Sequence, residues 1–125
     1  MELKLNNIRF VGRKSGKDLI EAYNTADVFA ITSEKEGMPL VVLEAMASGL
    51  PIVGSDVIGI REIVKGVGVL VEGSSPENFA DALGKLWRNP EHLKELSSRS
   101  REEASKYSWE KLVGMLENIY KEIKK

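Results

Sequence analysis

VFAITSEKEGMPLVVLEAMASGLPIVG, residues 28–54, holds two short apolar runs on either side of a helical pattern. The runs VFAIT and PIVG are continuous rather than alternating, which is typical of strands that are covered on both faces of a parallel sheet. Pro39 suits the first position of the intervening helix, and Gly49 suits the position just past its end. The stretch therefore predicts a strand–helix–strand unit.

The same alternation continues on both sides of this unit. Strands are expected at Ile8–Val11 and Val67–Val71, and helices at Lys17–Asn24 and Ile60–Val64. From Ser75 onward only helical patterns remain, namely a helix capped by Ser75 and two more over residues 91–106 and 109–123. This order predicts an α/β fold: a three-layer, Rossmann-like, mainly parallel sheet of about four strands, with helices on both faces and a C-terminal helical tail.

Composition narrows the classes of protein. The 125 residues fit one domain, and the net charge of −1 gives no overall field that favours nucleic acid or an anionic membrane. The absence of Cys and the single His argue against disulfides and against a Cys/His zinc site. No apolar run approaches the length of a membrane span. We therefore expect a cytoplasmic protein with no metal site and no nucleic-acid partner.

The loop before the central helix is the candidate ligand site. In an open parallel sheet, ligands collect at the carboxyl ends of the strands, where this loop lies. Gly37 lets the backbone approach a ligand closely. The backbone N–H groups of Met38, Leu40 and Val41 lie near the helix start, where such groups lack intrahelical partners and can bind phosphate oxygens.

Two glutamates flank this helix start. Glu36 and Glu44 are separated by seven residues. A carboxylate accepts hydrogen bonds from two neighbouring hydroxyls at once, so the pair could hold two polyols on either side of a diphosphate, as in a sugar nucleotide. The residues alone leave a second interpretation open, in which Glu36 is a solvated loop acid and Glu44 a surface residue.

A family resemblance bears on this choice. The run SEKEGMPLVVLEAMASGLPIVGSDVIGIREIV, residues 33–64, closely resembles the E-x7-E region of the group 1 retaining glycosyltransferases with the GT-B fold. The similarity extends over NIRFVGRKSGKDLIEAYNTADVFAITS before it, and over GVGVLVEGSSPENFADAL and YSWEKLVGMLENIYKEI after it. Essentially the whole chain is covered.

The resemblance implies a role for each residue that matches the motif. Glu36 would be the catalytic-site carboxylate that binds hydroxyls of the transferred sugar and helps to orient it. The amides of Gly37, Met38 and Leu40 would bind sugar or phosphate oxygens. Glu44 would hold the ribose hydroxyls of the nucleotide, with Val41 packing nearby, although core packing is the simpler role for Val41.

Two departures from the family pattern stand out. The family commonly has a Gly-Gly pair where this chain reads Ile58-Gly59, so that loop is expected to approach the ligand less closely. The family's C-terminal domain also begins with an additional βαβα portion, whose first loop supplies an Arg and a Lys for the diphosphate. Arg13 and Lys14 are candidates to bind phosphate in its place, or are simply solvated.

The resemblance implies transfer of a hexose from a nucleoside-diphosphate sugar to an acceptor, with no cofactor besides that donor. We expect residues 1–125 to form one truncated C-terminal donor-binding domain that is inactive without the N-terminal acceptor domain. Other expected partners are a second copy, through an exposed sheet edge, and a membrane surface touched by the parent enzyme. The alternatives are a stand-alone sugar-nucleotide-binding or interaction module, a folding or design protein derived from the family, and a phosphorylase or sugar-phosphate synthase with the same donor fold.

Overall fold

A computed structural model describes residues 5–73 and 75–124. Three parallel strands form its sheet in the order β1-β2-β3: β1 (Phe29–Ile31), β2 (Ile52–Ser55) and β3 (Gly68–Val71). Phe29 pairs with Ile52, and Ile52 with Gly68. The strands alternate along the chain with α1 (Gly16–Thr25), α2 (Leu40–Ala47) and α3 (Ile58–Val64). The predicted α/β class and parallel sheet are confirmed.

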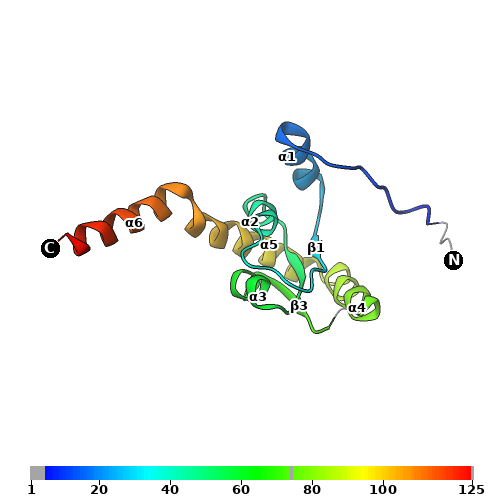
Figure 1. Ribbon diagram of the computed structural model, residues 1–125. Coiled ribbons are helices and arrows are strands. Elements are labelled where there is room, and N and C mark those ends of the chain that lie inside the picture. The colour runs from blue at the N-terminus through cyan, green and yellow to red at the C-terminus, as the bar shows by residue number, and fades with distance from the viewer. Residues whose placement is uncertain (1–4, 74, 125) are drawn as a thin grey trace.

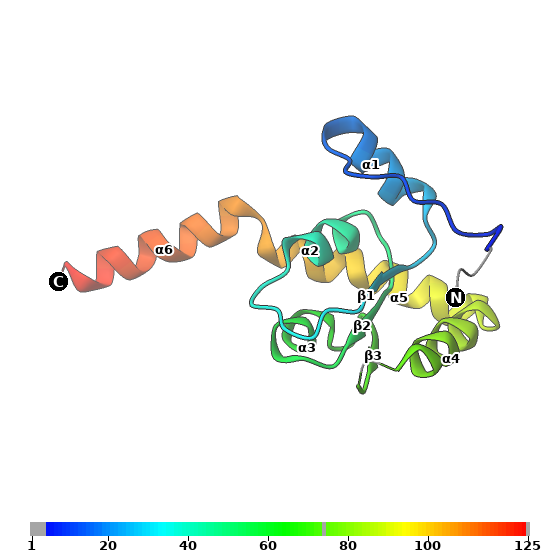
Figure 2. The same ribbon diagram turned by 45° about the vertical axis from the view of Figure 1, so that its right-hand side comes forward.

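The expected first strand is wrong. Ile8–Val11 is not part of the sheet, and the chain before α1 runs away from it (Figures 1 and 2). The side chain of Phe10 is 95% exposed. The apolar, β-branched composition of the segment favours a strand only where a neighbouring strand and a covering layer are present, because β propensity largely measures packing. Within the described residues the segment has neither, so the sheet has three strands instead of about four.

Helices cover both faces of the sheet, as expected. Ile52 packs in one core with Val42 and Met46 of α2 and with residues of α3. Its neighbour Val53 points to the opposite face and packs in a second core with Phe79 of α4 (Pro76–Trp87). This alternation follows from the two-residue period of a strand. The result is the predicted three-layer arrangement.

Helix α2 ends and packs as its sequence indicates. The helix begins at Leu40, so Pro39 is the N-cap residue and not the first helical residue as expected. Gly49 just past the helix end has a φ of +81°, a conformation that glycine adopts most readily. Val42 and Met46 are fully buried, which confirms that they are core residues. Val41 is 45% exposed and therefore lies outside the core.

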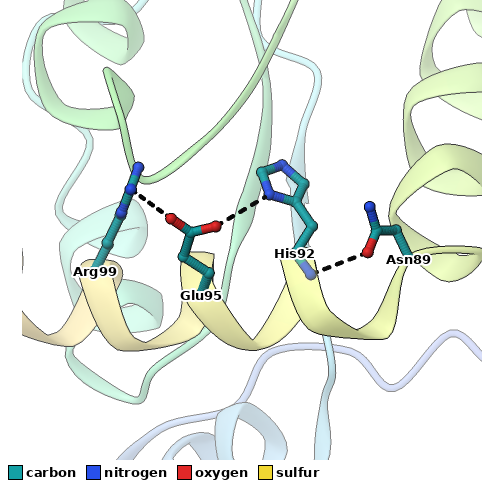
Figure 3. A network of polar contacts seen from close by, with 4 residues as sticks. All are labelled: Asn89, His92, Glu95 and Arg99. Atoms are coloured by element: carbon teal, nitrogen blue, oxygen red, sulfur yellow. Dashed lines mark hydrogen bonds and ion pairs between the residues drawn. The ribbon is translucent and has the colours of Figure 1, made fainter.

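Helix α5 (Pro90–Ala104) ties the helical part of the chain to the sheet. The side-chain oxygen of Asn89 caps its start by accepting from the backbone N–H of His92 (Figure 3). Ser97 donates to the carbonyl of Gly49 at 2.6 Å, and Ser100 donates to the carbonyl of Val67 at 3.2 Å. Both contacts anchor α5 to chain turns that enter strands.

The C-terminal helix stands apart from both cores. A 3-10 turn (Ser105–Tyr107) leads into α6 (Trp109–Ile123), which extends away from the sheet (Figure 1). The predicted tail is thus present, and its apolar stripe is exposed. Trp109 is 77% exposed, and Trp87 at the end of α4 is 79% exposed. No helix within the described residues is long and apolar enough to span a membrane.

Candidate functional site

The loop that carries Glu36 lies at the carboxyl end of β1, and the other strands end at the same edge. A small cavity of about 290 Å³ opens there, and it is lined by residues at or just after the ends of all three strands: Ser33, Glu34, Ser55, Asp56, Val57 and Gly73. Asp56 is paired with Arg61 of α3 at 2.6 Å. This hydrogen bond and the carboxylate charge hold the pKa of Arg61 above its usual value.

Gly59 lets the loop that carries Glu36 pack closely against the start of α3. A Cβ atom at Gly59 would lie 2.1 Å from the carbonyl oxygen of Gly37 and 2.3 Å from that of Glu36. Real Cβ atoms do not approach backbone oxygens so closely, so only glycine lets the loop rest on the start of α3. The side chain of Glu36 is half-buried beside this contact. The second glycine position of the Ile58-Gly59 pair therefore supports the loop directly, whereas Ile58 is 71% exposed.

Glu44 projects from the second turn of α2. Its side chain is exposed, and its Oε2 atom accepts a hydrogen bond of 3.0 Å from the hydroxyl of Tyr23 in α1. The same hydroxyl lies 3.5 Å from the carbonyl oxygen of Val41. Burial raises the pKa of Tyr23 to about 12, and the hydrogen bond to Glu44 and its charge act in the same direction. Tyr23 therefore stays protonated and remains a donor to Glu44.

Three of the candidate residues share one groove. Met38, Leu40 and Glu44 line a groove of about 680 Å³ that continues to the corner between α5 and α6, where Tyr107, Trp109 and Leu112 form its other wall. Glu36 lies outside this groove. Along the chain, the backbone of Gly37, Met38 and Leu40 lies between the two glutamates, at the start of α2.

The candidate phosphate residues lie on a different element. Arg13 is exposed in the loop before α1, and Lys14 lines a small cavity with Arg9, Asp18 and Glu21. This loop is at the opposite end of α1 from Tyr23. The structure thus groups Lys14 with acidic residues of α1 and leaves Arg13 exposed in the same loop, and neither lines the groove that contains Glu44.

In the part of the chain that the structure describes, the single histidine is paired only with its neighbours on the same helix. His92 lies exposed on α5, where its Nδ1 atom is 3.7 Å from Glu95, which is itself paired with Arg99 (Figure 3). Within residues 5–73 and 75–124, no group of three or more His, Cys, Asp or Glu side chains is placed to hold a metal ion.

Two residues of the site escaped the sequence reasoning. In the sequence, Tyr23 is one of several apolar residues of the expected helix Lys17–Asn24, and Gly59 is the one glycine of the Ile58-Gly59 pair. The signal for Tyr23 was its hydroxyl, since a tyrosine on a buried helical stripe needs a polar partner for that group. The sequence did not show that the partner is Glu44, which is 21 positions away.

Comparison with known proteins agrees with this geometry. The family model "Glycosyl transferases group 1" matches residues 2–103. D-inositol 3-phosphate glycosyltransferase of Saccharomonospora viridis is 38% identical over 98% of this chain, and that of Corynebacterium urealyticum is 33% identical over 93%. The chain spans 29% and 28% of the lengths of these two relatives.

A solved structure shares the fold as well. Sucrose-phosphate synthase from Thermosynechococcus elongatus superimposes with a TM-score of 0.83 and 28% sequence identity, covering 92% of this chain and 30% of that one. The parallel sheet, the helices on its two faces and the matched sequence all agree with the GT-B glycosyltransferases. This chain belongs to the group 1 glycosyltransferase family.

Proposed function

We propose that this chain is the donor-binding part of a retaining glycosyltransferase that moves a hexose from a nucleoside-diphosphate sugar to an acceptor. The observation that carries the proposal is the placement of two carboxylates around one helix start. Glu36 lies in the loop before α2, at the carboxyl end of β1, and Glu44 lies one turn into the helix. Membership of the family supports assigning the matching roles to both.

The proposed roles follow from charge. A carboxylate next to a phosphate is repulsive, so Glu36 and Glu44 act on the hydroxyls at the two ends of the donor. Glu36 binds the transferred sugar and Glu44 the ribose, while the amides of Gly37, Met38 and Leu40 face sugar or phosphate oxygens at the helix start. Val41, which is exposed next to these amides, packs against the donor.

Catalysis in this proposal is electrostatic. The leaving diphosphate gains charge in the transition state, and fixed dipoles and cations stabilise it. Arg13 and Lys14 are the proposed cations of this chain, and reaching the diphosphate requires the loop before α1 to move toward α2. No cofactor besides the sugar nucleotide is needed for this chemistry.

Turnover is proposed to need a second domain. The chain spans less than a third of the lengths of its curated relatives, so residues 1–125 are assigned to donor binding alone. The acceptor then comes from an N-terminal domain, which closes the cleft and positions the acceptor against the donor sugar. The isolated chain is expected to bind donor without transferring the sugar.

Titration calorimetry tests the proposal. UDP-glucose, GDP-mannose and ADP-glucose are each titrated into the wild-type chain, into Glu44→Ala and into Glu117→Ala, a matched control on the exposed face of α6. We expect one donor to bind, and Glu44→Ala to weaken that binding about tenfold or more, as loss of a charged hydrogen-bond acceptor does. Glu117→Ala should bind like wild type. The absence of binding up to millimolar concentrations of all three donors would contradict the proposal.

A further inference from the structure

Tyr23 and Glu44 form a contact between two helices that are far apart in sequence. The Tyr23 hydroxyl donates to the Glu44 carboxylate at 3.0 Å, from α1 to α2. The tyrosine side chain is buried, at 9% exposure, while Glu44 is exposed. A buried, fixed donor thus holds one oxygen of an otherwise solvated side chain.

Packing accounts for the ring of Tyr23 but not for its hydroxyl. The ring belongs to the core beneath α2 and lies against Phe29, with 6.0 Å between ring centroids. A phenylalanine would fill the same space. The carbonyl of Val41, at 3.5 Å, is at the limit of a hydrogen bond, so the carboxylate of Glu44 is the main partner of the hydroxyl.

The contact leaves Glu44 free to bind a ligand. Only Oε2 accepts from Tyr23, and Oε1 has no hydrogen bond to any residue in the described part of the chain. A tyrosine hydroxyl keeps its proton throughout the physiological range, and burial, which raises the pKa of Tyr23 to about 12, extends its role as a donor to higher pH.

We propose that Tyr23 is a positioning residue that fixes the Glu44 carboxylate for a ribose diol, an inference that rests on the proposed donor-binding function. A free glutamate side chain loses rotamer entropy when a ligand immobilises it. Tyr23 removes part of this cost before the ligand arrives, because the carboxylate is already held in one orientation. The specificity of the site for ribose over deoxyribose then depends on Tyr23 as well as on Glu44.

Binding of nucleotides tests this role through substrate discrimination. UDP, GDP and ADP and their 2′-deoxy counterparts are titrated into wild type, Tyr23→Phe, Glu44→Ala and the double variant. We expect Tyr23→Phe to lower the affinity for the ribonucleotide about fivefold, and to lower the affinity for its 2′-deoxy counterpart much less. The hydroxyl should add nothing once Glu44 is replaced, because the pair acts as a unit. Tyr120→Phe, an exposed tyrosine on α6, is the control and should leave both affinities unchanged.

Equal losses of affinity for the ribonucleotide and the deoxyribonucleotide would overturn the inference. So would a loss of affinity that persists in the Glu44→Ala background, since a purely structural role of Tyr23 predicts both.

A measurement without ligand separates this outcome from failure of the proposed function. Three-bond NMR couplings of the Glu44 methylene groups should report one rotamer in wild type and averaged rotamers in Tyr23→Phe. Unchanged couplings overturn the positioning role whatever binds. Averaged couplings in a chain that binds no nucleotide uphold the Tyr23–Glu44 contact and reject Glu44 as a ribose ligand.

Discussion

Gly59 has no Cβ atom, and this absence determines where the loop that carries Glu36 lies. The carbonyl oxygens of Glu36 and Gly37 occupy the space in which any other residue would carry its Cβ atom. Gly59 is buried at the start of α3, the helix that follows β2. The position of the loop after β1 therefore depends on a contact with the helix after β2. A small change there should move Glu36 without touching it.

Gly59→Ala is expected to lower donor affinity about tenfold and to destabilise the fold by about 1–3 kcal/mol, since the added methyl group must displace backbone atoms. Calorimetry with the donor that binds wild type and thermal unfolding measure the two effects. Gly114→Ala on α6 is the matched control, because nothing lies within 4 Å of its Cβ position. The control should keep donor affinity and gain up to about 1 kcal/mol from helix propensity. Wild-type affinity in Gly59→Ala would show that the loop position does not matter for donor binding.

The candidate site could be predicted in part, and the reason lies in how its contacts are distributed. Glu36, Gly37 and Glu44 belong to one short segment, so their spacing alone places them around a helix start. Tyr23 and Gly59 reach the same segment from other elements, through contacts that exist only in the folded chain. Sequence periodicity could mark Tyr23 as buried, but a single sequence carries no information on which side chain its hydroxyl meets.

The elements follow the same division between local and tertiary signals. Ser75 caps α4 by accepting from the N–H of Asn78, as its Ser-Pro-Glu sequence predicts, and Gly49 ends α2 in a left-handed conformation. These features depend on neighbouring residues only. Ile8–Val11 has equally strong local signals for a strand, yet a strand exists only by pairing, and the described residues offer this segment no partner.

Helix α5 depends on a buried polar contact that the sequence does not reveal. The hydroxyl of Ser100 is fully buried and donates to the carbonyl of Val67, just before β3. Ser100→Ala removes this donor, so the buried carbonyl of Val67 loses its hydrogen bond from Ser100. The loss should lower the free energy of unfolding by about 1–2 kcal/mol.

Urea unfolding followed by circular dichroism measures the loss. Ser98→Ala is the control, because Ser98 lies exposed in the same helix and undergoes the same substitution. It should change the free energy of unfolding by less than about 0.5 kcal/mol. Equal stabilities of the two variants would mean that the Ser100 hydroxyl contributes nothing to the anchoring of α5.

At the scale of the molecule, the exposed apolar side chains include a stripe on α6 and several residues of the segment before α1. The stripe on α6 includes Leu116 at 48% and Ile123 at 74% exposure, and the segment before α1 includes Phe10 at 95%. The sheet is also open, since β1 pairs with β2 on one side only within the described residues. The outer side of β3 is unpaired among the described residues as well, and an unpaired strand edge is a template for addition of another strand. A sheet edge is therefore the expected route of self-association, and the edge of β1 offers a direct test.

The β1 edge can be closed without disturbing the sheet. The N–H of Phe29 donates to the carbonyl of Pro51 on the β2 side, so the N–H of Ala30 points to the open edge. We expect the wild-type chain to show a mass above that of one chain at millimolar concentration in sedimentation equilibrium. Ala30→Pro should restore the single-chain mass, because proline removes the edge donor and leaves the β1–β2 hydrogen bonds in place. Leu116→Lys, which breaks the apolar stripe of α6, should leave the association unchanged.

If Leu116→Lys dissociates the chains and Ala30→Pro does not, α6 and not the sheet edge holds them together. A single-chain mass for wild type at every concentration would refute association through either surface.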